Sequence, residues 1–164
     1  MQKITPFLWF DTQAEEAANF YVSLFPNSKI KNIARYPSDS PPPAGPPGKV
    51  MTVDFELDGQ AYTALNGGPH FTFTEAVSFM VHCADQAEVD RYWDALTADG
   101  GKESQCGWLK DKYGLSWQIV PQQLMDLYSS PDKVAVGRMF AAMMKMVKLD
   151  MPKLKAAFDG ETAA

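Results

Sequence analysis

The chain has 164 residues, of which 46% are apolar and 21% charged, and it carries a formal net charge of -5 with a pI near 4.9. This length and composition fit one folded domain and exclude a largely disordered chain. The acidic charge argues against nucleic acid or an anionic membrane as a partner, because either would require a basic face. A small molecule or another protein is the expected partner.

Cellular location and redox state can be estimated from simple sequence features. The first residues lack the pattern of a signal peptide, and no apolar run approaches the roughly 20 residues of a membrane span. We therefore expect a cytoplasmic protein. Cys83 and Cys106 lack a metal-type spacing and are too few for a disulfide framework, so both are predicted to be reduced thiols.

The first half of the chain predicts a strand, a helix and three further strands. Residues 4–10 are rich in β-forming residues, and Thr12 with Glu15 forms a capping-box pattern that opens a helix reaching about Phe25. Strand signals follow at 28–36, 49–57 and 60–66, and an Asp-Gly turn joins the last two. Alternation in the second of these strands places four apolar residues on one face: Met51, Val53, Phe55 and Leu57.

The second half repeats this order. Residues 76–84 predict a strand, and Asp85 with Glu88 repeats the capping pattern before a helix that ends at Gly100–Gly101. Strand signals at 102–109 and 115–120 flank a turn. The helix segments TQAEEAANFY and DQAEVDRYW share a Gln-Ala-Glu start and a late aromatic pair. This similarity predicts an internal duplication.

Two other regions differ from this pattern. The segment 37–48 is rich in proline, which cannot pair within a sheet, so it is predicted to be a long loop. A stiff connector, a mobile flap over a pocket and a polyproline ligand are the alternatives for it. After Pro121 we expect a short helix at 123–128, a helix at 132–149 and a last helix from Pro152, with a methionine stripe in the core or at a dimer contact.

The segments LNGGP, FMVHCADQAEVD, CGWLKDKYG and SWQIVP resemble the PhnB-like branch of the vicinal oxygen chelate superfamily, which includes glyoxalases, bleomycin-resistance proteins and dioxygenases. Members of this branch are often described as 3-demethylubiquinone-9 3-methyltransferase-like domains. The resemblance implies an α+β fold in which tandem βαβββ modules form curved mixed sheets around a cup for a small ligand, and it implies a homodimer. We expect one domain over 1–164, with modules at 1–68 and 75–122 and C-terminal helices at 123–160.

Enzymes of this superfamily usually hold a divalent metal through His and Glu side chains in the cup. The resemblance puts Thr5, Asn66, Ser78 and Gln118 at the corresponding positions, and none of these is His, Asp or Glu. Such a neutral set binds divalent metals weakly, so we expect no metal. The chain also lacks a glycine-rich turn between a strand and a helix, so we expect no nucleotide-derived cofactor for methyl transfer.

Alternation along the strands predicts the residues that face the cup. They are mainly aromatic with a few polar groups, a composition that suits a largely apolar, planar ligand. The alternative is that they fill a small closed barrel in which Trp9 and Trp117 are core anchors. His82 and Ala64 share this predicted face, and the ligand-binding candidates on it are Thr5, Phe7, Trp9, Tyr62, Asn66, Ser78, Met80 and Gln118.

Three functions remain open from the sequence. The first is a metal-free protein that binds a small molecule. The second is a lyase, isomerase or methyltransferase-type enzyme, related to quinones as the family description suggests, that uses His82 or Cys106 as the catalytic residue. Lys110 and Lys112 follow Cys106 closely and would favour a thiolate there, whereas a structural role is the alternative for His82. The third is an interaction protein whose dimer matters more than its cup.

Overall fold

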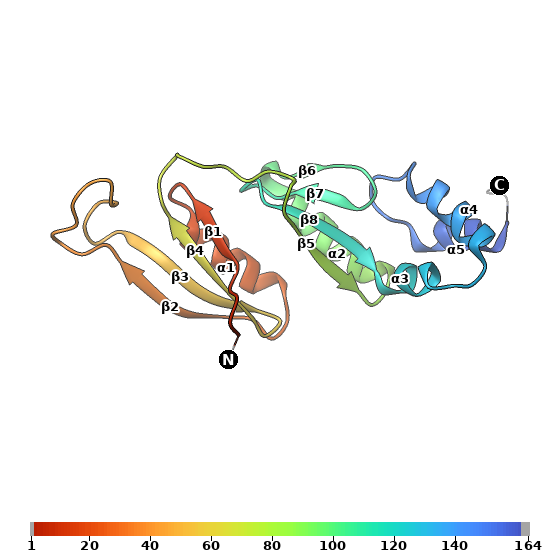
Figure 1. The fold of residues 1–164 in the computed structure, drawn as a ribbon, viewed down its shortest axis with the longest axis horizontal. Coiled ribbons are helices and arrows are strands. Elements are labelled where there is room, and N and C mark those ends of the chain that lie inside the picture. The colour runs from red at the N-terminus through yellow and green to blue at the C-terminus, as the bar shows by residue number, and fades with distance from the viewer. Residues whose placement is uncertain (1, 162–164) are drawn as a thin grey trace. The chain divides into compact units, whose positions relative to one another are not determined.

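The computed structural model describes residues 2–161 and divides the chain into two compact units, 1–73 and 74–164. Each unit contains a strand, a helix and three more strands, as Figure 1 shows from red to cyan. The elements of the first unit are β1 (Phe7–Phe10), α1 (Ala14–Leu24), β2 (Lys29–Arg35), β3 (Val50–Leu57) and β4 (Gln60–Asn66).

The first unit is one four-stranded mixed sheet with a helix on one face. The strands lie in the order β1-β4-β3-β2, with β1 parallel to β4 and the other pairs antiparallel. α1 packs along β3 and β4, and buries its small residues together with Tyr21 (Figure 1). Val53, Phe55 and Leu57 are buried on the helix side of β3, which confirms the face predicted by alternation.

The second unit repeats this topology and adds the C-terminal helices. Its strand order, β5-β8-β7-β6, again makes the first strand parallel to the last, and α2 buries Val89, Tyr92, Trp93 and Leu96 against the sheet. This repetition confirms the predicted α+β fold of tandem βαβββ modules. The elements are β5 (Ser78–Cys83), α2 (Gln86–Thr97), a short 3₁₀ turn (Ala98–Gly100), β6 (Lys102–Glu103), β7 (Trp108–Lys110), β8 (Ser116–Pro121), α3 (Gln122–Tyr128), α4 (Lys133–Met143) and α5 (Met151–Asp159).

The two helices that follow the first strand of each unit begin differently. At α2, the Asp85 carboxylate accepts the Glu88 N–H at 2.9 Å and the Glu88 carboxylate accepts the Ala84 N–H at 2.7 Å, so the predicted cap is confirmed. At α1 the prediction of a capping box from Thr12 is wrong. The side-chain oxygen of Asn66, at the end of β4, accepts the Ala14 N–H at 2.8 Å, because a neighbouring strand supplies the acceptor that a cap residue would otherwise provide.

The predicted helix over 132–149 is interrupted. α4 ends at Met143, and the carbonyls of Met146 and Val147 accept the N–H groups of Cys106 and Gly107 at 2.9 and 2.8 Å. The helix stops because this segment hydrogen-bonds to the turn before β7 instead of to itself. Met139 is buried in the C-terminal core, as expected of the methionine stripe. Phe140, the next residue of α4, is 47% exposed.

The proline-rich loop is held at its neck and folds back on Tyr36. The backbone of Tyr36 donates to the Lys49 carbonyl and accepts from Gly48, both at 2.9 Å. Gly45 lies so close to the Tyr36 ring that an added Cβ would approach it to 2.3 Å, so glycine is required there. Across the described residues 2–161, none of the helices has the length and apolar character needed to cross a membrane.

Candidate functional site

Within its unit, the first sheet has one face that α1 does not cover, which we call the first open face. The register pairs Phe7 with Thr63 and Trp9 with Leu65, so these side chains share that face. Asp54 joins them across β3, where its carboxylate accepts the Thr63 hydroxyl at 2.7 Å. Phe7 is 59% exposed. The first open face therefore combines an exposed aromatic ring with a hydrogen-bonded polar pair.

Trp9 is fixed in this face by close contacts. Its indole N–H donates to the Gly68 carbonyl at 2.9 Å, and its ring meets Phe71 edge-to-face with centroids 5.0 Å apart. A side chain at Gly67 would come within 2.2 Å of the indole. Gly67 and Gly68 therefore serve the packing and hydrogen bonding of Trp9.

Three predicted cup residues, Tyr62, Ala64 and Asn66, lie on the opposite face of the first sheet. Tyr62 and Ala64 are buried opposite Phe55 and Val53 on the helix side, and burial raises the pKa of Tyr62. The prediction that these residues share a face with Phe7 is wrong. β1 pairs with β4 so that Phe7 lies beside Thr63, which places Tyr62 and Ala64 on the other face of β4.

Thr5 and Asn66, two of the positions that the superfamily uses for metal ligands, are also placed differently from the prediction. Thr5 precedes β1 and is exposed. The Asn66 side chain accepts the Ala14 N–H at 2.8 Å and donates to the Val50 carbonyl at 3.1 Å. Both polar ends of Asn66 are therefore engaged in holding α1 and β3.

The second sheet also has a face that α2 does not cover, which we call the second open face. The register places Met80 beside Gln118 and Ser78 beside Ser116, and the Gln118 amide donates to the Ser78 hydroxyl at 2.8 Å. His82 lies two residues beyond Met80 on the same face and is exposed. The structure thus brings Ser78, Met80, His82 and Gln118 together on one face, while their part in binding stays a prediction.

Three further residues of the second open face, Trp108, Lys110 and Ser116, were not predicted from the sequence. Trp108 pairs with Gln118 and Lys110 pairs with Ser116, so these side chains stand beside the predicted ones. Their neighbours Leu109 and Trp117 are buried on the helix side. Alternation on either side of the apolar Leu109 could have predicted that Trp108 and Lys110 face away from the helix. That Lys110 lies beside Ser116 could not be predicted, because it depends on the register of β7 against β8.

Cys106, the second catalytic candidate, lies apart from the sheet positions, in the turn before β7. The residue is half-buried, has a backbone φ of +58°, and its Sγ lies 3.7 Å from the Met144 sulfur. Lys110 pairs with Glu75 at 2.6 Å and Lys112 with Asp99 at 3.8 Å. Both lysines therefore pair with carboxylates, and the prediction that they favour a thiolate at Cys106 is not supported.

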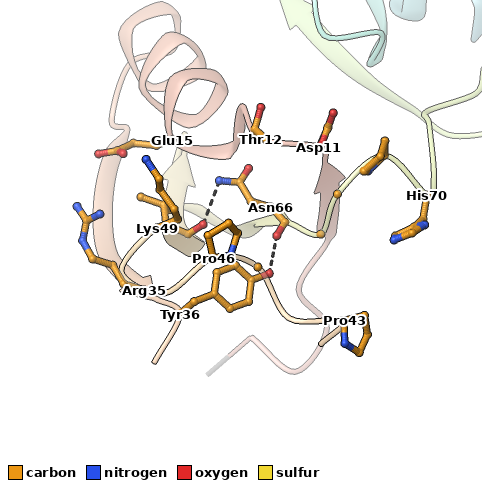
Figure 2. Close-up of a pocket in the computed structure, with 15 residues that line it drawn as sticks. Asp11, Thr12, Glu15, Arg35, Tyr36, Pro43, Pro46, Lys49, Asn66 and His70 are labelled. Atoms are coloured by element: carbon orange, nitrogen blue, oxygen red, sulfur yellow. Dashed lines mark hydrogen bonds between the residues drawn. The ribbon is translucent and has the colours of Figure 1, made fainter. Parts of the chain in front are cut away.

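A cavity of about 720 Å³ lies in the first unit beneath the proline-rich loop (Figure 2). Pro43 and Pro46 of the loop form part of its wall, and the Tyr36 hydroxyl donates to the Asn66 carbonyl at 2.6 Å. The loop therefore lies against this cavity, and its role as a connector, a flap or a polyproline ligand stays a prediction. The cavity is lined by acidic and basic side chains that come from distant parts of the unit: Asp11, Glu15, Arg35, Lys49 and His70.

The residues present do not fit the divalent metal that the sequence resemblance implies. Ser78 and Gln118 are hydrogen-bonded to each other, and Asn66 is engaged elsewhere. Within residues 2–161, no three His, Cys, Asp or Glu side chains gather as they would to hold a metal ion. Hydroxyl and amide groups alone are weak donors for a catalytic divalent metal, so these positions do not form a metal site.

The glycine pairs likewise do not fit a nucleotide-derived methyl donor. Gly67 is packed against Trp9. Gly101 follows α2 at a point where an added Cβ would lie 2.4 Å from the Leu96 carbonyl oxygen, so its role is to let the chain turn. Neither pair leads from a strand into the first turn of a helix, which is the arrangement that binds phosphates.

Comparisons with known proteins agree with this fold. The family described as 3-demethylubiquinone-9 3-methyltransferase matches residues 2–120, a match that ends before α3. A PhnB protein from Bacillus cereus is 40% identical, with a match covering 73% of this chain and 99% of that one and a TM-score of 0.66. Protein PA1353 from Pseudomonas aeruginosa is 22% identical over 74% of this chain and 98% of its own, with a TM-score of 0.60, and shows the fold alone. No curated protein matches. The chain therefore belongs to the 3-demethylubiquinone-9 3-methyltransferase family and is PhnB-like.

Proposed function

We propose that this protein binds a small, largely apolar or aromatic molecule on the open faces of its sheets, without a metal. The observation that supports this most directly is the exposure of large apolar side chains beside polar groups on those faces. Phe7 is 59% and Met80 41% exposed, and each stands on a sheet that is covered by a helix on its other side. Exposed apolar patches with a few convergent polar groups are typical of binding sites.

The polar groups on these faces can orient such a molecule. On the second open face, the Gln118 amide and the Ser78 hydroxyl are paired with each other, and both retain capacity for a further hydrogen bond. Burial of one large apolar side chain against a ligand contributes about 1.5–3 kcal/mol. Several such contacts are needed to offset the loss of translational freedom on binding, which favours a ligand that covers more than one of these side chains.

The test compares truncations on the open faces with matched truncations elsewhere. We expect Phe7→Ala or Met80→Ala to weaken the binding of a neutral aromatic probe such as 2-naphthol about tenfold or more, in line with the loss of one apolar contact. Phe140→Ala and Met144→Ala remove the same side chains from exposed positions outside the sheets and should leave the affinity within about twofold. Affinities are measured by isothermal titration calorimetry.

Each outcome of this test has a meaning. An effect of Met80→Ala assigns the probe to the second open face, and an effect of Phe7→Ala assigns it to the first. Equal affinity for the wild type, Phe7→Ala and Met80→Ala would contradict the proposal. Thermal unfolding of each variant checks the fold, which should be preserved because both side chains are substantially exposed.

An enzyme that uses His82 is the second candidate function. The observation that favours it is that His82 is exposed on the same face as Ser78 and Gln118, where it could exchange a proton with a bound molecule. If the protein catalyses a reaction on its aromatic ligand, we expect His82→Ala to abolish turnover while the dissociation constant changes less than about threefold. Loss of binding in parallel with turnover would indicate a role in binding alone.

The remaining expectations concern assembly and location. An interaction protein whose dimer matters more than its cup stays the third prediction. The homodimer implied by the resemblance and the cytoplasmic location stay predictions, and sedimentation velocity of the full chain tests the first of these.

A further inference from the structure

We propose that the ligand is an aromatic carboxylate whose anionic group binds beside Ser116 and Lys110 on the second open face. This inference rests on the proposed function and names the chemical class of the ligand. It starts from a pocket of about 200 Å³ at the β6–β8 side of the sheet, whose lining includes Glu75, Lys102, Trp108, Lys110 and Ser116.

Ser116 supplies the first argument for a ligand in this pocket. The residue is only 1% exposed, and its hydroxyl is the buried side-chain polar atom that has no hydrogen-bond partner within residues 2–161. A buried hydroxyl without a partner costs about 1–3 kcal/mol, so such groups are rare and call for an explanation. An acceptor oxygen of a ligand in the pocket would satisfy this donor.

Two lysine side chains, Lys102 and Lys110, give the second reason to expect an anionic ligand in this pocket. Pairing across the strands places Lys102 beside Lys110, Lys110 beside Ser116 and Ser116 beside Ser78, so that two ammonium groups and two hydroxyls belong to one row of the sheet. Among the described residues, Lys102 has no ion-pair partner. This row can therefore offer both positive charge and hydrogen-bond donors to an anion.

The contact with Glu75 shows that the Lys110 ammonium group binds a carboxylate in this pocket. Its carboxylate lies 2.6 Å from the Lys110 ammonium, on the exposed segment before β5, and the Lys110 hydrogen bond holds the Glu75 pKa below its ordinary value. The other carboxylate of the lining, Glu103, accepts the Trp93 indole N–H at 2.7 Å. A ligand carboxylate that replaced Glu75 would gain the Ser116 hydroxyl as a second donor, which has no partner beside Glu75.

The neighbouring row of side chains on the sheet is placed to contact the ring of the ligand. Trp108, Gln118 and Met80 lie side by side across β7, β8 and β5, two residues along from the row of Lys110 and Ser116. Two residues of a strand span about 7 Å, which is close to the distance from a carboxylate to the far edge of one aromatic ring. A carboxylate held at Ser116 thus places its ring against Trp108 and Met80.

The experiment titrates the full chain with benzoate and with benzamide, which has the same shape without the charge. We expect benzoate to bind at least tenfold more tightly than benzamide. Lys110→Met should weaken benzoate binding about tenfold and leave benzamide binding unchanged, because benzamide carries no charge. Ser116→Ala should weaken benzoate binding about fivefold, because it removes one hydrogen-bond donor to the carboxylate. Glu75→Gln removes the competing carboxylate and should strengthen benzoate binding severalfold. Lys112→Met, two residues from Lys110 and outside the pocket lining, is the control.

The outcomes separate this inference from the proposed function. Equal affinity for benzoate and benzamide, or an effect of Lys110→Met no larger than that of Lys112→Met, would overturn the carboxylate site. If 2-naphthol still binds and depends on Met80 or Phe7, the proposed function stands without it. If no aromatic probe binds, both fail. Because Glu75→Gln acts in the opposite direction to Lys110→Met, a general loss of folding cannot imitate the expected pattern.

Discussion

Asp111→Ala is expected to lower the free energy of unfolding by about 3 kcal/mol or more, the largest stability effect of any single change considered for this chain. Asp111 is 3% exposed, and its carboxylate accepts the N–H groups of Tyr113 and Leu115 at 2.8 and 3.1 Å and the Trp117 indole N–H at 2.9 Å. Removing the carboxylate leaves these buried donors without their acceptor, at a cost of about 1–3 kcal/mol each.

The location of Asp111 explains why so much depends on it. It joins the end of β7 to the start of β8 through a tight turn, and Trp117 on β8 is buried in the core under α2. One carboxylate therefore fixes both the turn and the orientation of a core indole. Both strands contribute residues to the second open face, so Asp111 also supports the candidate site.

Urea unfolding followed by tryptophan fluorescence measures the effect, because Trp117 is the partner of Asp111. Asp111→Asn keeps one acceptor oxygen and should cost less than Asp111→Ala. Asp94→Ala, on the exposed side of α2, is the matched control and should change stability by less than about 0.5 kcal/mol. Similar midpoints for Asp111→Ala and Asp94→Ala would contradict the assignment.

The sequence predicted the topology well because its signals were local and repeated. The helical spacing of Val89, Tyr92, Trp93 and Leu96 and the alternation of β3 each depend on a single segment, and both were confirmed. The duplication of the first helix pattern in the second half supported the same conclusion independently. Features that depend on one segment alone could thus be read from the sequence.

The open faces were only half predictable because a face requires the register between two strands. On the second sheet the predicted residues Ser78, Met80 and Gln118 do lie on one face. On the first sheet Phe7 pairs with Thr63 and not with Tyr62, so Tyr62 lies under the helix. The same limit explains the cap of α1, because its acceptor, Asn66, is 52 residues from Ala14 in the sequence.

The cavities could not be predicted at all. The space beneath the proline-rich loop depends on the fold of the loop onto Tyr36, and the pocket at Ser116 depends on three strands and on Glu75. A serine in a strand gives no sign in the sequence that its hydroxyl will be buried without a partner. Only the packing of the surrounding elements creates that situation.

The two cysteines are expected to differ by orders of magnitude in thiol reactivity. Cys83 is fully buried, and burial, followed by the nearby Glu88 carboxylate, raises its pKa to about 12. Since the thiolate is the reactive form, a thiol with this pKa has a thiolate fraction roughly a thousandfold below the ordinary one at neutral pH. Cys106 is half-buried at the surface and should react readily.

A thiol-specific disulfide reagent measures this difference. The native chain should release about one equivalent of chromophore quickly and a second only after urea is added. Cys106→Ser should remove the fast phase and leave the slow one, whereas Cys83→Ala should do the reverse. Two equivalents released at equal rates from the native chain would show that Cys83 is accessible and would contradict its assignment to the core.

The raised pKa of Cys83 also predicts how stability depends on pH. In the unfolded chain the thiol ionises near its ordinary value of 9.0, while in the folded chain it holds its proton until about 12. Between these values the folded state binds one proton more than the unfolded state, so the stability contributed by this group is complete below pH 9 and falls as pH rises. Urea midpoints measured from pH 8 to 11 should therefore decline more steeply in the wild type than in Cys83→Ala, and equal slopes would contradict the shift.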